Sequence, residues 1–262
     1  MEIFVCLRQT AILKEEPKIQ PNGKTLDLSG VNRHLNEWDA YALEEALLLA
    51  QKYGGNVSII SLGPPEVEEV LFYGLAAGAK EAIHILTPEG RQIDNWVIAN
   101  ALAQEIKKHP FDLVLTGAQA EDDGCGEVGA TLAYLLGIPH ASLVMRVVYE
   151  PETNSLKVDR ELEEGYMDAL RLRLPALLTV QTGINQPRYV SSMRLRRFKK
   201  SATISRVSFD DLISGTEGFL PKKEIVKLYT YRPDVSKAKI LEGSPEAVAE
   251  QLIGQLISKG VL

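Results

Sequence analysis

The sequence predicts an α/β protein with a doubly wound, mostly parallel β-sheet, a small antiparallel extension and a C-terminal arm. Two observations predict this fold class. Through residues 3–116, short apolar runs rich in β-branched residues alternate with amphipathic segments. Beyond about residue 140, the strand-like runs follow one another closely with turn residues between them. Strand–helix alternation implies parallel pairing, right-handed crossovers and helices on both faces of one sheet.

Four apolar runs have the composition of strands covered on both faces. They are Ile3–Leu7, Val57–Leu62, Ala82–Leu86 and Asp112–Thr116. Three amphipathic segments separate or follow them and predict helices, namely Trp38–Lys52, Pro65–Ala77 and Asn95–Lys108. In the first helix, Leu43 and Leu47 lie near one face and Glu44 largely opposite. Prolines suit the start of the second helix, because a proline lacks only an N–H that has no partner there. Ligands of such folds gather at the carboxyl ends of the strands.

After about residue 140 the pattern predicts antiparallel strands separated by turns. These strands are Leu143–Glu150, Leu156–Leu162 and Met167–Leu174, and Ala176–Thr182 returns to an apolar strand. From Gln186 onward the chain is punctuated by prolines, is locally basic and ends in one amphipathic helix, Pro245–Lys259. We therefore predict an α/β core over residues 1–184, which includes the antiparallel extension, and a basic segment with a C-terminal arm over 185–262.

Composition excludes several classes of protein. A hydrophobic fraction of 45% with 24% charged residues is typical of a folded globular chain. The net charge of −6 gives no overall attraction to nucleic acid or to an anionic membrane. No apolar run approaches the ~20 residues of a membrane helix, and the opening MEIFVCLRQT lacks the charge pattern of a signal peptide. We expect a cytoplasmic protein, or a mitochondrial matrix protein in a eukaryote, without direct membrane insertion.

Metal and thiol chemistry find little support in the sequence. The chain has two cysteines, Cys6 and Cys125, too few for a disulfide framework or a thiolate metal site. The four histidines have no ligand-like spacing. Three adjacent carboxylates, Glu121, Asp122 and Asp123, raise the question of a magnesium site, but consecutive side chains point in different directions. We therefore interpret them as capping and solvated groups and predict no metal site.

Residues Gly124–Gly129 match the pattern G-x-G-x-x-G literally. In a dinucleotide fingerprint the first glycine follows its strand directly, whereas here Gly117–Asp123 intervene, so the spacing is wrong. Glu150 does lie about 20 residues further on, where that fingerprint has an acidic residue. A second interpretation is an anion-binding loop, in which glycines admit a phosphate and helix 127–136 offers free N–H groups. A glycine-rich connection without a ligand is the third, and we favour the second.

Blocks of sequence spread along nearly the whole chain resemble the β subunit of electron-transfer flavoproteins. They are MEIFVCLRQ, LNEWDAYALEEAL (35–47), ISLGPPEVEEVL and GLAAGAKEAIHI (60–85), DLVLTGAQAEDDG with EVGATLAYLLGIP (112–139), and VDRELEEGYMDALRLRLPALLTVQTGINQPRY (158–189). The resemblance implies an adenine-nucleotide-binding, HUP-like fold and a heterodimer with an α subunit that carries FAD. That heterodimer relays electrons between flavoproteins such as acyl-CoA dehydrogenases and a downstream acceptor, in some members by bifurcation. It also implies an electron carrier without bond chemistry of its own, so we predict no catalytic residue.

The resemblance further implies a pocket in this subunit for AMP or a second FAD. Carried over by position, its residues are Cys6, Asn36, Glu37, Trp38, Asp39, Leu62, Gly63, Gly117, Gln119, Asp123, Gly124, Cys125, Gly126, Glu127, Val128 and Gly129. Gly126 and Val128 stand where AMP-type members usually have Asn and Thr, which shifts the expectation modestly towards FAD. Glu127 stands where the family tends to have Gln, and its carboxylate would repel a phosphate unless it points away.

The stretch NQPRYVSSMRLRRFKK (185–200) interleaves apolar and basic side chains. The resemblance implies a recognition loop here that docks on a dehydrogenase partner, with Pro187, Arg188, Tyr189, Met193, Leu195, Arg196 and Arg197 as its residues. Met193 or Leu195 would be the apolar anchor, and the arm beyond would pack on the α subunit. The residues alone also suit a solvated charged face beside a helix, and the acidic chain argues against nucleic acid.

Two other functions stay open at this point. One is an NAD-dependent oxidoreductase that uses Gly124–Gly129 as its fingerprint, and the other is a nucleotide-sensing module without a redox partner.

Overall fold

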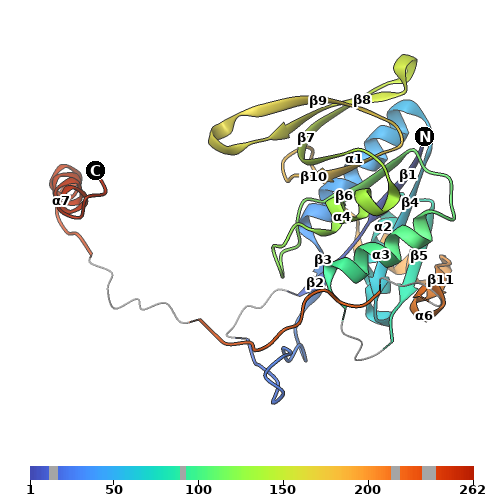
Figure 1. The fold of residues 1–262 in the computed structure, drawn as a ribbon, viewed down its shortest axis with the longest axis horizontal. Coiled ribbons are helices and arrows are strands. Elements are labelled where there is room, and N and C mark those ends of the chain that lie inside the picture. Colours follow the sequence, from blue (N-terminus) through green and yellow to red (C-terminus); the bar gives the residue numbers. More distant parts are fainter. Residues whose placement is uncertain (12–16, 89–92, 214–218, 232–239) are drawn as a thin grey trace.

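One nine-stranded sheet organises the computed structural model, which describes residues 1–11, 17–88, 93–213, 219–231 and 240–262 (Figure 1). Its strand order is β11-β5-β4-β1-β6-β10-β7-β8-β9. The pairs from β11 to β7 are parallel, and the β7–β8 and β8–β9 pairs are antiparallel. The structure thus confirms the predicted α/β class with a mostly parallel sheet.

The parallel strands correspond closely to the apolar runs of the sequence. They are β1 (Glu2–Cys6), β4 (Asn56–Gly63), β5 (Glu81–Leu86), β6 (Leu113–Gly117) and β10 (Ala176–Val180). The first strand lies at the centre, where Val5 is opposite Ile59 on one side and Leu115 on the other. All three of these side chains are fully buried. Their burial explains why the strands read as continuous apolar runs without alternation.

Helices cover both faces of the sheet. On one face lie α1 (Glu37–Tyr53) and α2 (Glu68–Ala77), which begins after the short helix η1 (Pro65–Val67). On the other lie α3 (Asn95–Ile106), α4 (Val128–Leu136) and α6 (Phe209–Ile213). Leu43 of α1 belongs to one buried cluster, and Leu102 of α3 with Leu132 of α4 belongs to the other. This two-sided covering is the doubly wound arrangement that the sequence predicts.

The antiparallel extension is continuous with the main sheet. It consists of β7 (His140–Glu150), β8 (Ser155–Glu161) and β9 (Met167–Arg173), with the short helices η2 (Pro151–Thr153) and η3 (Glu163–Gly165) at the turns. Near its start β7 pairs in parallel with β10, and farther on it pairs antiparallel with β8. The strand therefore begins earlier than the predicted Leu143. A second, two-stranded sheet joins β2 (Gln9–Ala11) to β3 (Arg33–Leu35).

After residue 184 the chain packs against the core again. Helix α5 (Ser192–Ser201) leads to β11 (Ser205–Ser208), which adds to the edge of the sheet beside β5. Phe209, directly after β11, is fully buried. The sequence did not predict α5, β11 or α6. Residues 214–218 and 232–239 of the predicted arm lie outside the described residues.

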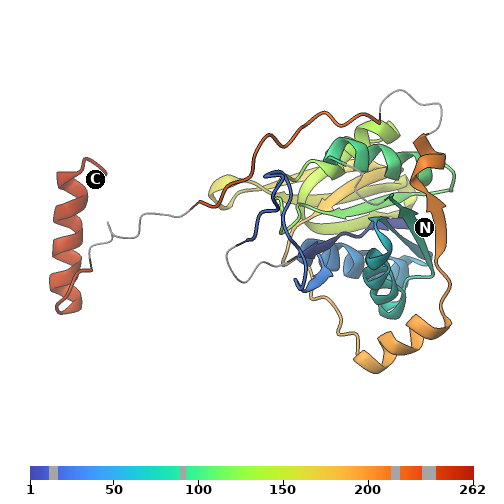
Figure 2. The same cartoon turned by 90° about the horizontal axis from the view of Figure 1, so that it is seen from below.

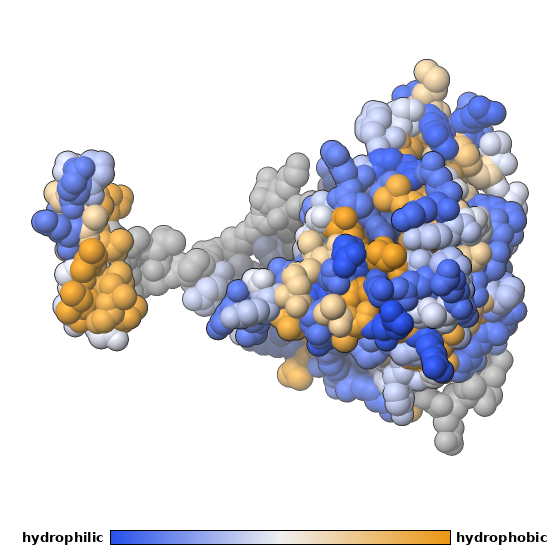
Figure 3. All heavy atoms as spheres, turned by 90° about the horizontal axis from the view of Figure 1, so that it is seen from above, coloured by the Kyte–Doolittle hydropathy of each residue, from blue (hydrophilic) through white to orange (hydrophobic). Residues whose placement is uncertain are grey.

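The final helix, α7 (Pro245–Ser258), matches the predicted C-terminal helix and stands apart from the core (Figures 1 and 2). None of its residues is buried. Figure 3 shows a continuous apolar face on it, to which Leu252, Ile253 and Ile257 contribute exposed side chains. Among the described residues, no helix has the length and apolar character needed to cross a membrane.

Candidate functional site

A cavity of about 400 Å³ opens at the carboxyl ends of β1, β4 and β6. This edge is where ligands bind in open α/β sheets. Eleven of the sequence-predicted site residues line it: Cys6, Asn36, Asp39, Leu62, Gly117, Gln119, Asp123, Gly126, Glu127, Val128 and Gly129. Five do not: Glu37, Trp38, Gly63, Gly124 and Cys125. The structure thus brings residues from four distant stretches into one cavity.

The five remaining residues border the cavity or point elsewhere. The Trp38 indole donates to Gln181 Oε1 at 2.8 Å, at the end of β10, and Glu37 is exposed. Gly63 packs against Val67, because a Cβ there would lie 2.4 Å from Val67 Cγ2. Gly124 and Cys125 lie between Asp123 and Gly126, which line the cavity.

Sequence reasoning missed several polar or charged lining residues, Arg8, Arg33 and Asn95 among them. Asn95 opens α3 on the carboxyl side of β5. The rule that ligands gather at the carboxyl edge would have pointed to it. Arg33 lies on β3, whose pairing with β2 the strand–helix pattern did not reveal.

Asp39 ties together the strand ends that form the floor of the cavity. It lies in the first turn of α1 and is buried. Its carboxylate accepts from the backbone N–H of Arg8 at 2.7 Å and of Gly117 at 2.9 Å. Burial raises the pKa of Asp39 to about 7, although both hydrogen bonds oppose that rise. A Cβ on Gly117 would lie 2.5 Å from Asp39 Oδ1, so only glycine suits that position.

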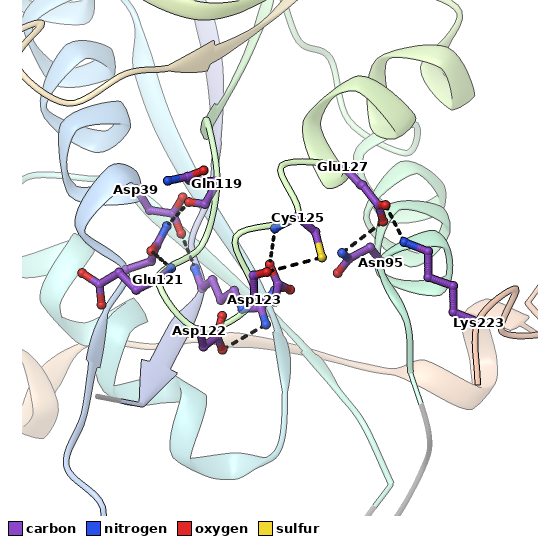
Figure 4. A network of polar contacts seen from close by, with 11 residues as sticks. Asp39, Asn95, Gln119, Glu121, Asp122, Asp123, Cys125, Glu127 and Lys223 are labelled. Atoms are coloured by element: carbon purple, nitrogen blue, oxygen red, sulfur yellow. Dashed lines mark hydrogen bonds and ion pairs between the residues drawn. The ribbon is translucent and has the colours of Figure 1, made fainter. Parts of the chain in front are cut away.

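Asn36 fixes the loop that follows β6. Its side-chain N–H donates to the carbonyl of Gln119 at 2.9 Å, and its Oδ1 accepts from the backbone N–H of Glu121 at 3.2 Å (Figure 4). Asn36 is itself buried at the N-terminus of α1. The helix start and the loop therefore hold each other in place, which explains why an asparagine precedes the helix without capping it.

The three glycines of Gly124–Gly129 serve different structural needs. Gly124 and Gly126 have φ values of 59° and 63°, in the left-handed region that favours glycine. Gly129 lies in the first turn of α4, where a Cβ would lie 2.4 Å from Thr179 Cγ2 and 2.8 Å from Thr116 Oγ1. The first two glycines bend the loop, and the third lets α4 approach the sheet.

This arrangement argues against a dinucleotide fingerprint. Strand β6 ends at Gly117, well before Gly124, and β6 is not the first strand of the fold. Glu150, the acidic residue that the fingerprint would need, pairs with Lys157 and Arg171 in the antiparallel extension and does not line the cavity. The start of α4 nevertheless lies at the same edge of the sheet, where Val128 and Gly129 line the cavity.

The carboxylates of the acidic run beside the cavity, Glu121 to Asp123, contact side chains from other segments. Arg8 pairs with Asp122 and with Asp123, each at 3.0 Å. Glu121 accepts from Thr10 at 3.2 Å and contacts His34 Nε2 at 2.7 Å. No cluster of three or more potential metal ligands occurs within the described ranges. The run therefore joins the loop after β6 to β1, β2 and β3.

Glu127 is held by groups from two other segments (Figure 4). Asn95 Nδ2 donates to Glu127 Oε2 at 3.3 Å, and Lys223 forms an ion pair with Oε1. The hydrogen bond from Lys223 lowers the pKa of Glu127 below its ordinary range, with a smaller contribution from Asn95. The carboxylate is therefore ionised at neutral pH and its charge is balanced by Lys223.

Neither cysteine offers a nucleophile near neutral pH. Burial raises the pKa of the Cys6 thiol, and the charge of Asp39 raises it further. The pKa of Cys125 is also raised, by desolvation and then by the charges of Asp123 and Glu127. Both side chains are therefore thiols, because only a depressed pKa yields a reactive thiolate.

The basic segment 185–200 is anchored at one end and exposed at the other. The guanidinium of Arg188 donates to both oxygens of Glu44 on α1, at 2.7 and 2.9 Å. Tyr189 is 87% exposed and Met193 is 82% exposed. Of the other predicted recognition residues, Pro187 and Leu195 are half-buried, and Arg196 and Arg197 are exposed. Residues 192–201 form a helix, α5, where the sequence predicted a loop.

Comparisons with known proteins agree on one family. The model of the electron transfer flavoprotein domain matches residues 24–212. The chain is 34% identical to the electron transfer flavoprotein subunit beta of Methylophilus methylotrophus, over 99% of this chain and 98% of that protein. It is 32% identical to the Bacillus subtilis protein of the same name, over 99% and 98%. The human protein of that name is 31% identical over 76% of this chain and 78% of its own.

Proposed function

On the premise that this chain belongs to the electron transfer flavoprotein family, we propose that it is the β subunit of a heterodimeric electron carrier. In this proposal an α subunit completes the particle, and FAD held in the heterodimer supplies the redox chemistry. The heterodimer passes electrons from flavoprotein dehydrogenases, such as acyl-CoA dehydrogenases, to a downstream acceptor. The present chain positions the cofactor and the partners and contributes no acid, base or nucleophile of its own.

We further propose that the cavity holds an adenine nucleotide, either AMP or the adenosine part of a second FAD. The observation that carries this proposal is the junction of β6 with α4. There, left-handed glycines and the free N–H groups of a helix N-terminus lie beside a cavity of about 400 Å³. That volume is within the range of small-molecule sites. Apolar side chains of Leu62, Ile98 and Leu102 line the same cavity and suit the face of a base.

The residues of this chain divide the work of binding. Main-chain groups near Cys6 and Leu62 would contact the edge of the adenine, and the N–H groups that follow Gly126 would receive the phosphate. Gly126 has room for little else, because a Cβ there would lie 3.2 Å from the Ala118 carbonyl oxygen. Asp39 and Asn36 hold the strand ends and the loop in register from behind. Such preorganisation reduces the entropic cost of binding.

The C-terminal half of the proposal concerns partners. Helix α7 exposes Leu252, Ile253 and Ile257, and the arm would pack on the α subunit through this face. Helix α5 would meet the dehydrogenase, with Met193 as its apolar contact and Arg196 and Arg197 as charged neighbours. Arg188 would hold the base of that surface against α1 through Glu44. Whether the heterodimer bifurcates electrons would depend on the nucleotide in this cavity and partly on the α subunit.

Nucleotide extraction tests this function directly. The chain is co-expressed with the α subunit, the purified heterodimer is denatured, and released nucleotides are separated and counted against protein. One FAD with one AMP supports the conventional carrier, and two FAD support the bifurcating form. A chain that purifies alone, binds NAD(H) and lacks flavin would instead be an oxidoreductase of a different class. Nucleotide binding without flavin or companion chain would indicate a sensing module.

A further inference from the structure

Residues 219–231, here called the strap, pass along the carboxyl edge of the sheet (Figure 2). The backbone N–H groups of Lys222 and Lys223 donate to Asp94 Oδ2, at 2.5 and 3.0 Å. The other oxygen of Asp94 caps α3 by accepting from Val97 at 2.9 Å. One carboxylate therefore fastens the strap to the start of a helix that lines the cavity.

The strap is fastened a second time farther along. Leu228 donates its backbone N–H to the carbonyl of Gly23 at 2.8 Å, and Lys24 pairs with Glu224 at 2.8 Å. Both partners come from the excursion between β2 and β3. With contacts at both ends, the strap holds residue 223 in a defined place beside the cavity.

The position of Lys223 matters because of the charges that line the cavity. Two arginines, Arg8 and Arg33, line the cavity together with four carboxylates, Asp39, Asp122, Asp123 and Glu127. Arg8 forms ion pairs with both Asp122 and Asp123, so its single positive charge offsets one of their two negative charges. Asp39 is buried beneath the floor and hydrogen-bonded to the backbone. Glu127 receives its cation from outside the lining, because Lys223 of the strap supplies it.

Glu127 immediately precedes α4, whose first N–H groups would receive a phosphate in the proposed function. An uncompensated carboxylate at that place would oppose a phosphate by Coulomb repulsion. We propose that Lys223 is a specificity-determining residue, which acts through Glu127 to let the cavity accept nucleotides that bear a phosphate. This inference rests on the proposed function and adds to it a residue from the arm.

A purely structural role for the pair is less consistent with its exposure. The side chain of Glu127 is 41% exposed and that of Lys223 is 62% exposed. Ion pairs this open to solvent contribute little to the stability of a fold. The pair bears more directly on a third charge nearby, because a phosphate in the cavity would meet either a neutral pair or a bare carboxylate. The pair should therefore influence ligand affinity more than folding.

The test compares phosphate-bearing and phosphate-free ligands. The heterodimer containing the full chain is stripped of nucleotide and titrated calorimetrically with AMP and with adenosine. We expect Lys223→Met to weaken AMP binding about five- to tenfold and to leave adenosine binding unchanged. The difference should shrink at high salt, because screening weakens exposed charges. Lys227→Met on the same strap is the matched control, and Lys223→Arg should keep the wild-type affinity.

A double variant tests the route through the carboxylate. Glu127→Gln combined with Lys223→Met removes both charges and should restore AMP binding to near the wild-type value. Failure of this restoration would overturn the route through Glu127. Equal AMP affinity in Lys223→Met and wild type would overturn the inference, as would an equal loss for adenosine. If the wild-type protein binds no adenine nucleotide at all, the proposed function fails instead, so the two failures are distinguishable.

Discussion

The buried carboxylate of Asp39 accepts a hydrogen bond from the backbone N–H of Gly117 at 2.9 Å, from the end of β6. Its second oxygen accepts from the N–H of Arg8, directly after β1 and Leu7, at 2.7 Å. A single side chain on α1 thus joins the ends of two neighbouring strands at the floor of the cavity. This arrangement makes Asp39 and Gly117 a coupled pair whose disturbance should be measurable.

We expect Gly117→Ala to destabilise the protein by about 1–3 kcal/mol, because overpacking forces atoms apart in a tightly packed site. The new Cβ would lie 2.5 Å from Asp39 Oδ1 and 2.6 Å from Trp38 Cβ. Urea unfolding measures the change. Gly254→Ala in α7 is the control, since its Cβ would meet nothing within 4 Å. Equal urea midpoints for the two variants would show that Asp39 can move away from the new Cβ without a loss of stability.

Stability should fall as pH rises through the range in which Asp39 ionises. Burial raises its pKa to about 7 in the folded protein, against about 4 in the unfolded chain. The folded state therefore keeps a proton that the unfolded state has released. Linkage then predicts a loss on the order of 4 kcal/mol between about pH 4 and pH 7.

Urea unfolding at several pH values between about 4 and 8 measures this slope, with Asp39→Asn as the comparison. The variant cannot ionise at position 39, so its stability should decline less over the same range. Glu45, whose pKa is also raised by burial, remains in both proteins and cancels in the difference. Parallel curves for the two proteins would contradict the prediction.

Two glycines of one motif should respond differently to the same substitution. Gly129→Ala places a Cβ 2.4 Å from Thr179 Cγ2 and should push α4 away from the sheet, with a loss of about 2 kcal/mol or more and weakened nucleotide binding. Gly124→Ala meets no atom within 4 Å and carries only the strain of φ 59°, about 1 kcal/mol. Unfolding and nucleotide titration of both variants check this order, and the reverse order would refute it.

Helix α5 offers a pair of apolar residues with separable roles. Met193 is 82% exposed, whereas Phe198 packs against a buried cluster of the core. We expect Met193→Ala to weaken binding to an acyl-CoA dehydrogenase without lowering the melting temperature. Phe198→Ala should instead cost about 1–2 kcal/mol of stability. Binding measured by surface plasmon resonance and thermal unfolding separate the two effects. Unchanged dehydrogenase binding in Met193→Ala would remove this residue as the anchor.

The distribution of apolar residues explains which parts of the fold could be predicted from the sequence. The strands β1, β4, β5 and β6 are continuous apolar runs, and α1 has one apolar face, so burial is visible in the residue pattern itself. Strand β11 has the sequence SRVS and sits at the edge of the sheet, where exposed positions need no apolar residues. Its pairing with β5 depends on a distant part of the chain, which no local pattern reveals.

The same distinction applies to the candidate site. The family resemblance, carried over by position, predicted eleven residues of the cavity lining. The ion pair of Glu127 could not be predicted from the sequence, because its partner Lys223 lies far along the chain and is brought near only by the strap. Helix α5 has a local start signal in the sequence, a serine at its N-cap position. Ser191 caps it by accepting from the N–H of Arg194 at 3.3 Å, and a serine before a helical segment is a known start signal.

The central position of β1 has a consequence for how the chain acquires its structure during synthesis. This strand leaves the ribosome before its neighbours β4 and β6, and β5 gains its outer neighbour only when β11 emerges. Most of the sheet's pairing thus joins segments distant in sequence, a topology that folds slowly. A nascent chain that stops before residue 208 leaves the edge of β5 open to other strands, so truncated products of this polypeptide should aggregate.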